Sequence, residues 1–203
     1  ILIGLVGSEM CIRDRLYPLK GNIFIQGKNY DDLAEKSIRE HFAVAFQEHH
    51  IFNLSIRDNF KMLYEDITDE EIYKSLENVY LLDFVKQVGL NYIVGNDGNK
   101  LSGGQKHRLQ LAICLAKQKD IILLDEPTAG LDIKTTNNIC SQLMEKYQKQ
   151  TMIVTSHDIS LLRFFDDIII CGEEKIIEQG NIKKILLRED SYLNKLIRYK
   201  NFI

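Results

Sequence analysis

The chain has 203 residues, of which 45% are hydrophobic and 27% charged, a composition that suits one globular domain with a sizeable core. Its formal net charge of −3 provides no basic excess, which argues against a nucleic-acid partner. The cysteines lack metal-ligand spacing, and the odd set Cys114, Cys140 and Cys171 favours reduced thiols over disulfides. No apolar run is long enough to cross a membrane.

The first half of the chain is predicted to alternate short strands with helices. Residues 23–25 and 42–46 have the composition of short strands. Thr68 precedes Asp69-Glu70-Glu71, a capping-box pattern that predicts a helix running to about Tyr80. Residues 81–88 are expected to form a second, shorter helix.

The second half continues the alternation and indicates an α/β sheet. The run Ile121–Leu124 is rich in branched side chains and ends in two acids, as a buried parallel strand would. The remaining elements are expected to be helices over 103–117 and 135–147, strands over 152–156, 167–171 and 175–178, and an amphipathic helical tail over 182–199.

Three motifs follow one another in a fixed order. They are Leu101-Ser102-Gly103-Gly104-Gln105, then Ile122-Leu123-Leu124-Asp125-Glu126-Pro127, and later His157. This ordered set resembles the signature motif, Walker B strand and switch histidine of the ABC (ATP-binding cassette) transporter ATPases. Two positions depart from the family pattern: His107 stands where glutamine is common, and Ile113 stands where an arginine is usual.

The phosphate-binding loop of that family is absent from the sequence. No Gly-x-x-x-x-Gly-Lys-Ser/Thr occurs anywhere in the chain. Residues 5–15, Leu-Val-Gly-Ser-Glu-Met-Cys-Ile-Arg-Asp-Arg, match the translation of a transposon-type sequencing adapter, and the resemblance resumes at Leu16. We therefore expect residues 5–15 to be an adapter-derived artefact, residues 1–4 to be of uncertain origin, and residues 16–203 to be a fragment of the natural domain.

The resemblance implies a definite fold. It is an α/β, P-loop NTPase-like ABC ATPase core sheet with an inserted helical subdomain at about 51–117, and the first strands and the Walker A region are expected to be missing.

The end of the Walker B strand is the expected catalytic centre, because ligands of open α/β sheets bind beyond the carboxyl ends of the strands. A carboxylate at Asp125 can hold Mg²⁺, usually through water. The resemblance implies that Glu126 is the general base for the attacking water and that His157 contacts the γ-phosphate. It also matches Gln47 to the Q-loop glutamine, which reaches Mg²⁺ and the water.

The signature motif is the expected contact with a second copy of the domain. Ser102, Gly103, Gly104 and Gln105 begin a helix, whose free N–H groups and positive dipole end attract an anion, while glycines allow close approach. The resemblance implies that they grip the γ-phosphate of ATP held by a partner cassette, in a head-to-tail dimer with Asp132 at the interface.

These roles imply an ATP- and Mg²⁺-dependent ATPase domain that powers an exporter-type transporter from the cytoplasmic face of the cell membrane. The membrane domain would be fused upstream or carried by a separate chain, and it would meet residues 51–60 and 95–98, which resemble exporter cassettes. Without a Walker A loop, the fragment is expected to bind ATP poorly in its own site.

Two alternatives stay open. One is a soluble, non-transport ABC ATPase acting on ribosomes or DNA, although the D-loop sequence Ala129-Gly130-Leu131-Asp132 and the lack of a coiled coil do not favour it. The other is a degenerate regulatory cassette. Retention of Glu126 and His157 argues against that alternative, whereas the missing phosphate loop favours it.

Overall fold

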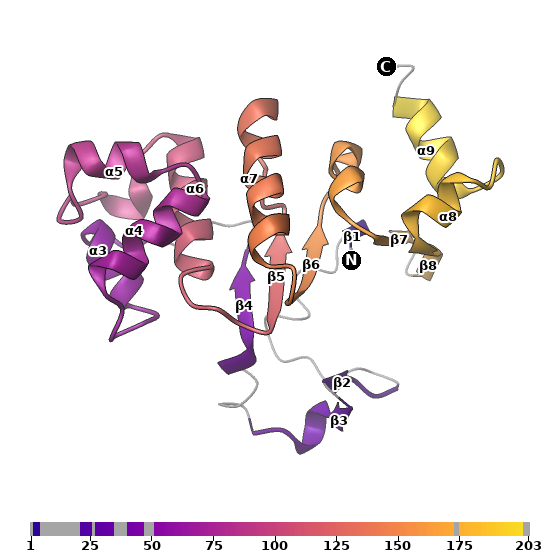
Figure 1. Ribbon diagram of the computed structural model, residues 1–203, viewed down its shortest axis with the longest axis horizontal. Coiled ribbons are helices and arrows are strands. Elements are labelled where there is room, and N and C mark those ends of the chain that lie inside the picture. The colour runs from indigo at the N-terminus through magenta and orange to yellow at the C-terminus, as the bar shows by residue number, and fades with distance from the viewer. Residues whose placement is uncertain are drawn as a thin grey trace.

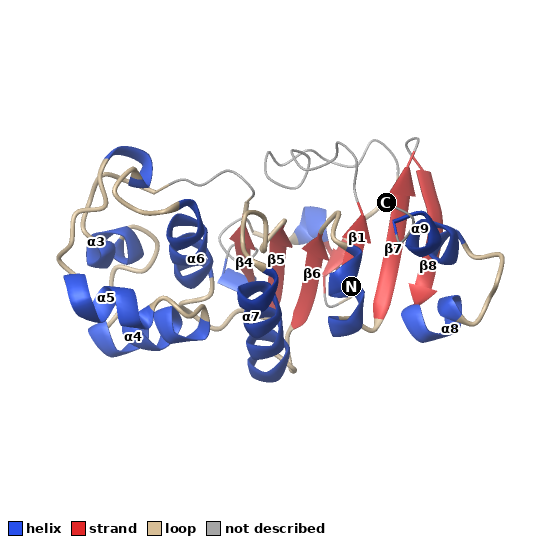
Figure 2. Cartoon of the chain, turned by 90° about the horizontal axis from the view of Figure 1, so that it is seen from above, coloured by secondary structure: helices blue, strands red, loops and turns tan. Residues whose placement is uncertain are grey.

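The computed structural model describes residues 2–4, 21–25, 27–34, 40–46, 51–172 and 175–200. Its main sheet has the strand order β4-β5-β6-β1-β7-β8, seen side by side in Figure 2. All neighbouring strands from β4 to β7 in this order pair in parallel, and β8 pairs with β7 in the antiparallel direction. The strands are β1 Leu2–Gly4, β4 Phe42–Ala45, β5 Ile121–Asp125, β6 Thr151–Thr155, β7 Asp167–Gly172 and β8 Lys175–Asn181.

The α/β fold class predicted from the sequence is confirmed. On β5, Ile122 and Leu124 are 1% and 2% exposed, while their neighbours are half-buried, as expected for an inner strand of a parallel sheet. A separate two-stranded hairpin joins β2 (Phe24–Ile25) to β3 (Lys28–Asn29) and is followed by the short 3₁₀ helix η1 (Tyr30–Asp32).

Strand β1 is the part of the sheet that the sequence patterns do not predict, since the first strands were expected to be missing. Leu2 and Ile3 pair with both β6 and β7, so β1 supplies hydrogen-bond partners to two strands that would otherwise lack them in the sheet centre. Ile3 is level with Thr155, the last residue of β6. The chain therefore leaves β1 at the same edge of the sheet as the ends of β5 and β6. The expected adapter segment 5–15 lies outside the described residues.

Four helices gather at one end of the sheet, on the left in Figure 1, within the block expected to form the helical subdomain. Their shared core includes Phe60, Ile72 and Leu76, all fully buried. These helices are α3 Ile56–Lys61, α4 Asp69–Asn78, α5 Leu82–Val88 and α6 Gly103–Cys114, with the 3₁₀ helix η2 Asn96–Gly98 before α6.

The predicted capping box at the start of α4 is confirmed. The Glu71 amide donates to Thr68 Oγ1 at 3.2 Å, and the Thr68 amide donates to Glu71 Oε2 at 2.9 Å. Glu71 also forms an ion pair with Lys117, beyond the end of α6. The box therefore both begins α4 and ties it to the segment after the signature helix.

The C-terminus of α6 is capped by three hydroxyl groups from three different segments. Ser75 Oγ donates to the carbonyl of Ala112 at 2.5 Å, and Tyr64 Oη donates to that of Cys114 at 3.3 Å. Tyr147 Oη donates to the Leu115 carbonyl at 3.1 Å. These bonds satisfy carbonyls that have no partner within the helix, and α6 ends at Cys114, earlier than the predicted Lys117.

The remaining helices cover the second half of the chain, and one prediction there needs correction. The tail expected to be one helical stretch over 182–199 is two helices separated by a turn. Asn194 Nδ2 donates to the carbonyls of Leu186 and Arg188, which closes that turn, and Ser191 Oγ accepts from the Asn194 amide to begin the second helix. These helices are α7 Ile133–Lys146, the 3₁₀ helix η3 Ile159–Phe164, α8 Ile182–Leu186 and α9 Tyr192–Lys200.

The Glu71 carboxylate gives the fold a testable pH dependence. Its hydrogen bond with Lys117, and then that with the Thr68 amide, lower the pKa of Glu71 from 4.5 to about 2. Because the folded-state pKa is the lower one, the stabilisation is complete above pH 4.5 and is lost as the pH falls to about 2. We expect Glu71→Gln to lower the urea midpoint at pH 7 and to have little effect near pH 2. Glu70→Gln, in the same helical turn, is the control, and equal effects of both variants at pH 7 would contradict this role.

Candidate functional site

The carboxyl ends of β5 and β6 bring the predicted catalytic residues together. These strands are parallel and place Asp125 directly beside Thr155. The Thr155 hydroxyl donates to Asp125 Oδ1, so the carboxylate is fixed by the neighbouring strand. Asp125 thus stands at the edge of the sheet where ligands of this fold class bind.

Glu126 turns sharply away from the strand. Its φ of +46° lies in the left-handed region, which costs a non-glycine residue about 1 kcal/mol or more. The backbone is held there by a bond from the Glu126 amide to the Thr155 carbonyl at 3.1 Å and by one from the Ala129 amide to the Glu126 carbonyl, also 3.1 Å. This turn directs the Glu126 side chain toward the end of β6 instead of along the sheet.

Two donors after β6 orient the Glu126 carboxylate. Ser156 Oγ donates to Oε2 at 3.1 Å, and the His157 amide donates to Oε1 at 2.8 Å. The Glu126 side chain is 13% exposed. The result is an oriented acceptor that can take a proton from a water molecule beside it.

His157 lies at the rim of the same group. Its Nε2 is 3.8 Å from Glu126 Oε1, and its side chain is 65% exposed. The sequence predicted that Glu126 and His157 work at one site, and the structure places them side by side. The ring is accessible to a ligand at the sheet edge.

The signature residues form the N-terminus of α6. Ser102 and Gln105 make a reciprocal capping box. The backbone amide of Gln105 donates to Ser102 Oγ at 3.2 Å, and the backbone amide of Ser102 donates to Gln105 Oε1 at 2.9 Å. Among the described residues, a Cβ added at Gly103 would meet nothing within 4 Å, whereas one at Gly104 would lie 3.4 Å from Leu131 Cδ2. Packing against these residues therefore does not require glycine at 103, and the absence of a side chain leaves the helix start open to an outside group.

In this structure Asp132 caps a helix of its own chain. It begins α7 by accepting from the Thr135 amide at 2.9 Å and from Thr135 Oγ1 at 2.6 Å. The hydrogen bond from the Thr135 hydroxyl, followed by that from its amide, lowers the pKa of Asp132. The last predicted site residue, Gln47, lies outside the described residues.

Two residues that the sequence did not assign to the site connect α6 with the sheet edge. Buried His107, noted above only as a departure from the family pattern, lies with Nε2 2.6 Å from the carbonyl of Pro127, in the turn after Glu126. One helical turn later, Gln110 Nε2 donates to the Phe46 carbonyl at 3.1 Å, directly before Gln47. The i, i+3 spacing of two polar residues on the sheet-facing side of α6 was the available signal.

Two further features concern only the residues that the structure describes, namely metal-binding clusters and membrane-spanning helices. Among them, no group of three or more His, Cys, Asp or Glu side chains could hold a metal ion. No helix within these ranges is long and apolar enough to span a bilayer.

Comparison with known proteins identifies the family. The ABC transporter family profile matches residues 9–129. The chain belongs to the ABC transporter family. A solved structure of a bacterial Atm1-family ABC exporter with ATP bound superimposes with a TM-score of 0.88 at 27% identity, over 98% of this chain and 36% of the exporter chain.

Curated members of the ABC transporter family are similar over most of this chain. A β-(1→2)glucan export ATP-binding/permease protein from Bartonella bacilliformis is 32% identical over 91% of this chain and 31% of its own length. A glutathione/L-cysteine transport system ATP-binding/permease protein from Escherichia coli is 33% identical over 86% of this chain and 30% of its own length. An ATP-dependent lipid A-core flippase from Haemophilus influenzae is 33% identical over 88% of this chain and 31% of its own length. The chain spans about a third of the length of these relatives.

The bond between His107 and Pro127 gives a direct test of how α6 is held on the sheet edge. His107→Leu leaves the buried Pro127 carbonyl without its donor, which is expected to cost about 1–3 kcal/mol of unfolding free energy. His107→Gln keeps a donor and should lose less. Urea unfolding of the two variants measures the difference, and equal losses would show that packing volume alone explains the residue.

Proposed function

We propose that this chain is the nucleotide-binding part of an exporter-type ABC transporter, in which ATP hydrolysis between two paired cassettes drives transport across a membrane. The observation that carries the proposal is the Glu126 carboxylate, held by Ser156 and the His157 amide beside Asp125 at the sheet edge. The names of the similar relatives, which are export and transport proteins and a flippase, support the exporter assignment.

Each residue at the edge has a chemical task in this proposal. Glu126 accepts a proton from the attacking water, for which its two donors fix the position of the acceptor oxygens. The exposed ring of His157 contacts the γ-phosphate and stabilises charge there.

Mg²⁺ would be held by Asp125 and Gln47, together with waters and phosphate oxygens. The oxygen-donor chemistry of this pair suits a hard cation that keeps several waters. The ion would neutralise charge on the phosphates of the substrate.

In this proposal the chain contributes binding groups to the nucleotide site of a partner cassette, and it lacks the phosphate-binding loop for a nucleotide site of its own. The sequence contains no Gly-x-x-x-x-Gly-Lys-Ser/Thr loop that could follow β1 at the sheet edge. The open start of α6, from Ser102 to Gln105, would instead bind the γ-phosphate of ATP held by a second cassette. Asp132 would lie at the interface of this head-to-tail pair. A transmembrane domain, fused or separate, would hold the pair at the cytoplasmic face of the cell membrane.

A second candidate is a regulatory cassette that contributes its signature helix to a partner without hydrolysing ATP itself. The missing phosphate loop is the observation that favours it. The oriented Glu126 carboxylate favours hydrolysis, because a purely regulatory cassette has no need to hold that group in a strained turn.

The two candidates differ in what a restored loop would do. We define the loop-restored chain as one in which a Gly-x-x-x-x-Gly-Lys-Ser loop replaces residues 5–15, between β1 and Leu16. The chain itself is expected to show no ATPase turnover above background. The loop-restored chain is expected to hydrolyse ATP, and Glu126→Gln in it should reduce kcat by about 10²–10⁴-fold, the usual contribution of a general base.

Glu145→Gln, an exposed substitution on α7, is the matched control and should leave turnover unchanged. Robust ATPase activity of the unaltered 203-residue chain would contradict the proposed role of the missing loop. A loop-restored chain that folds and binds ATP but does not hydrolyse it would favour the regulatory cassette.

A further inference from the structure

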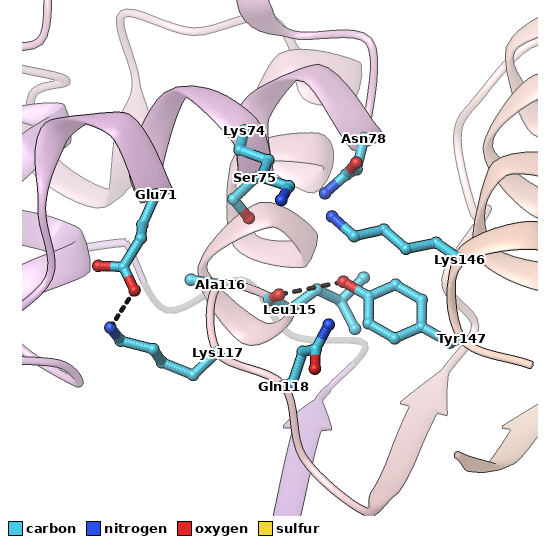
Figure 3. Close-up of a pocket in the computed structure, with 10 residues that line it drawn as sticks. All are labelled: Glu71, Lys74, Ser75, Asn78, Leu115, Ala116, Lys117, Gln118, Lys146 and Tyr147. Carbon is cyan, nitrogen blue, oxygen red and sulfur yellow. Dashed lines mark hydrogen bonds and ion pairs between the residues drawn. The ribbon is translucent and has the colours of Figure 1, made fainter. Parts of the chain in front are cut away.

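A cavity of about 310 Å³ lies where the C-terminal ends of α4, α6 and α7 meet (Figure 3). Its lining does not include Asp125, Glu126 or His157. Lys74 and Asn78 reach it from α4, and Lys117 from the segment after α6. Lys146 and Tyr147 enter from the end of α7. The cavity therefore joins the helical block to the helix that begins at the D-loop.

The lining carries more positive than negative charge. Lys117 is paired with Glu71, whose carboxylate also faces the cavity. Neither Lys74 nor Lys146 has an ion pair among the residues that the structure describes. Burial, and then the nearby charge of Lys74, lower the pKa of Lys146, while Glu77 opposes this effect. Two like charges thus approach one another across a partly enclosed space.

A third donor is aimed at the same space. Asn78 is 4% exposed, and its Nδ2 has no hydrogen-bond partner among the described parts of the chain. Figure 3 shows this nitrogen turned toward the ammonium groups of Lys74 and Lys146. In this orientation of the Asn78 amide, the buried N–H donor lacks an acceptor, and an acceptor bound in the cavity would satisfy it.

Lysines near helix C-termini often have a local role, and Lys146, in the last turn of α7, suits the dipole of that helix. Such lysines neutralise the negative end of the helix dipole or bind the last carbonyls. At the end of α6, however, the carbonyls of Ala112, Cys114 and Leu115 already accept from the hydroxyls of Ser75, Tyr64 and Tyr147. The ammonium groups of Lys74 and Lys146 are therefore not needed by those carbonyls.

We propose that this cavity binds a small oxyanion of the phosphate class through Lys74, Lys146 and Asn78. Three converging donors suit a tetrahedral anion, and the cavity has room for a phosphate group with a few further atoms. Binding holds α4 and the end of α6 against the end of α7. Occupancy therefore fixes the signature helix relative to the helix that carries Asp132, a regulatory role that is separate from ATP hydrolysis.

The test is a ³¹P NMR titration of the unaltered chain with inorganic phosphate and, in a second series, with glycerol 3-phosphate at constant ionic strength. Saturable line broadening is expected with at least one of them. Tighter binding of inorganic phosphate identifies the free ion as the ligand, and tighter binding of the ester identifies a phosphorylated small molecule.

Variants of the lining decide where the anion binds. Lys74→Met and Lys146→Met should each weaken binding about tenfold or more, since each removes a charged donor. Asn78→Asp, which is nearly isosteric and lies beside lysines, should fold and abolish binding by repulsion. Lys146→Arg keeps the charge and should retain binding, as should Lys149→Met, an exposed control beyond the end of α7.

Far-UV circular dichroism establishes that each variant is folded before titration. Absence of saturable broadening by either phosphate in the unaltered chain would overturn the proposal. Undiminished binding by folded Asn78→Asp would overturn it as well, because the anion would then bind elsewhere, such as at the start of α6.

Discussion

The parallel pairing of β5 with β6 is the constraint on which the rest of the site depends. It sets Asp125 beside Thr155, so that the residues following each strand leave the sheet at the same level. The left-handed turn at Glu126 then crosses from one strand end to the next, where Ser156 and the His157 amide receive the carboxylate. Shifting the register by one residue would reverse the faces of the strand and separate these groups.

The signature helix α6 is held to this edge at several points along its length. His107 contacts the carbonyl of Pro127, and Gln110 contacts that of Phe46, so α6 reaches the segments after both β5 and β4. Hydroxyls from separate segments hold its far end, and Tyr147 among them comes from α7. These polar contacts fix the helix that begins at Gly103 relative to the sheet edge.

Much of this arrangement could be predicted from the sequence, because strong local patterns and specific motifs coincide. The branched run of β5, the capping box at Thr68 and the motif order were sufficient for the fold and for placing Glu126 with His157. The partners of His107 and Tyr147 could not be predicted, because these contacts join residues far apart in the sequence. The spacing of His107 and Gln110 indicated at most a shared polar face of α6. The division of the tail was missed because its apolar periodicity continues across a turn made by side-chain bonds of Asn194. Strand β1 was missed because its place is fixed only by pairing with β6 and β7.

The central claim is that the catalytic edge and the signature helix are two halves of a nucleotide site shared between two copies. The most direct measurement is sedimentation velocity of the unaltered chain mixed with a loop-restored copy, with and without ATP and Mg²⁺. The loop-restored copy carries Glu126→Gln, and also Gly103→Arg so that it cannot pair with itself. The account predicts a heterodimer only with ATP, lost when Gly103→Arg in the unaltered chain fills the open helix start. Failure to associate with ATP, or association that Gly103→Arg leaves intact, would contradict it.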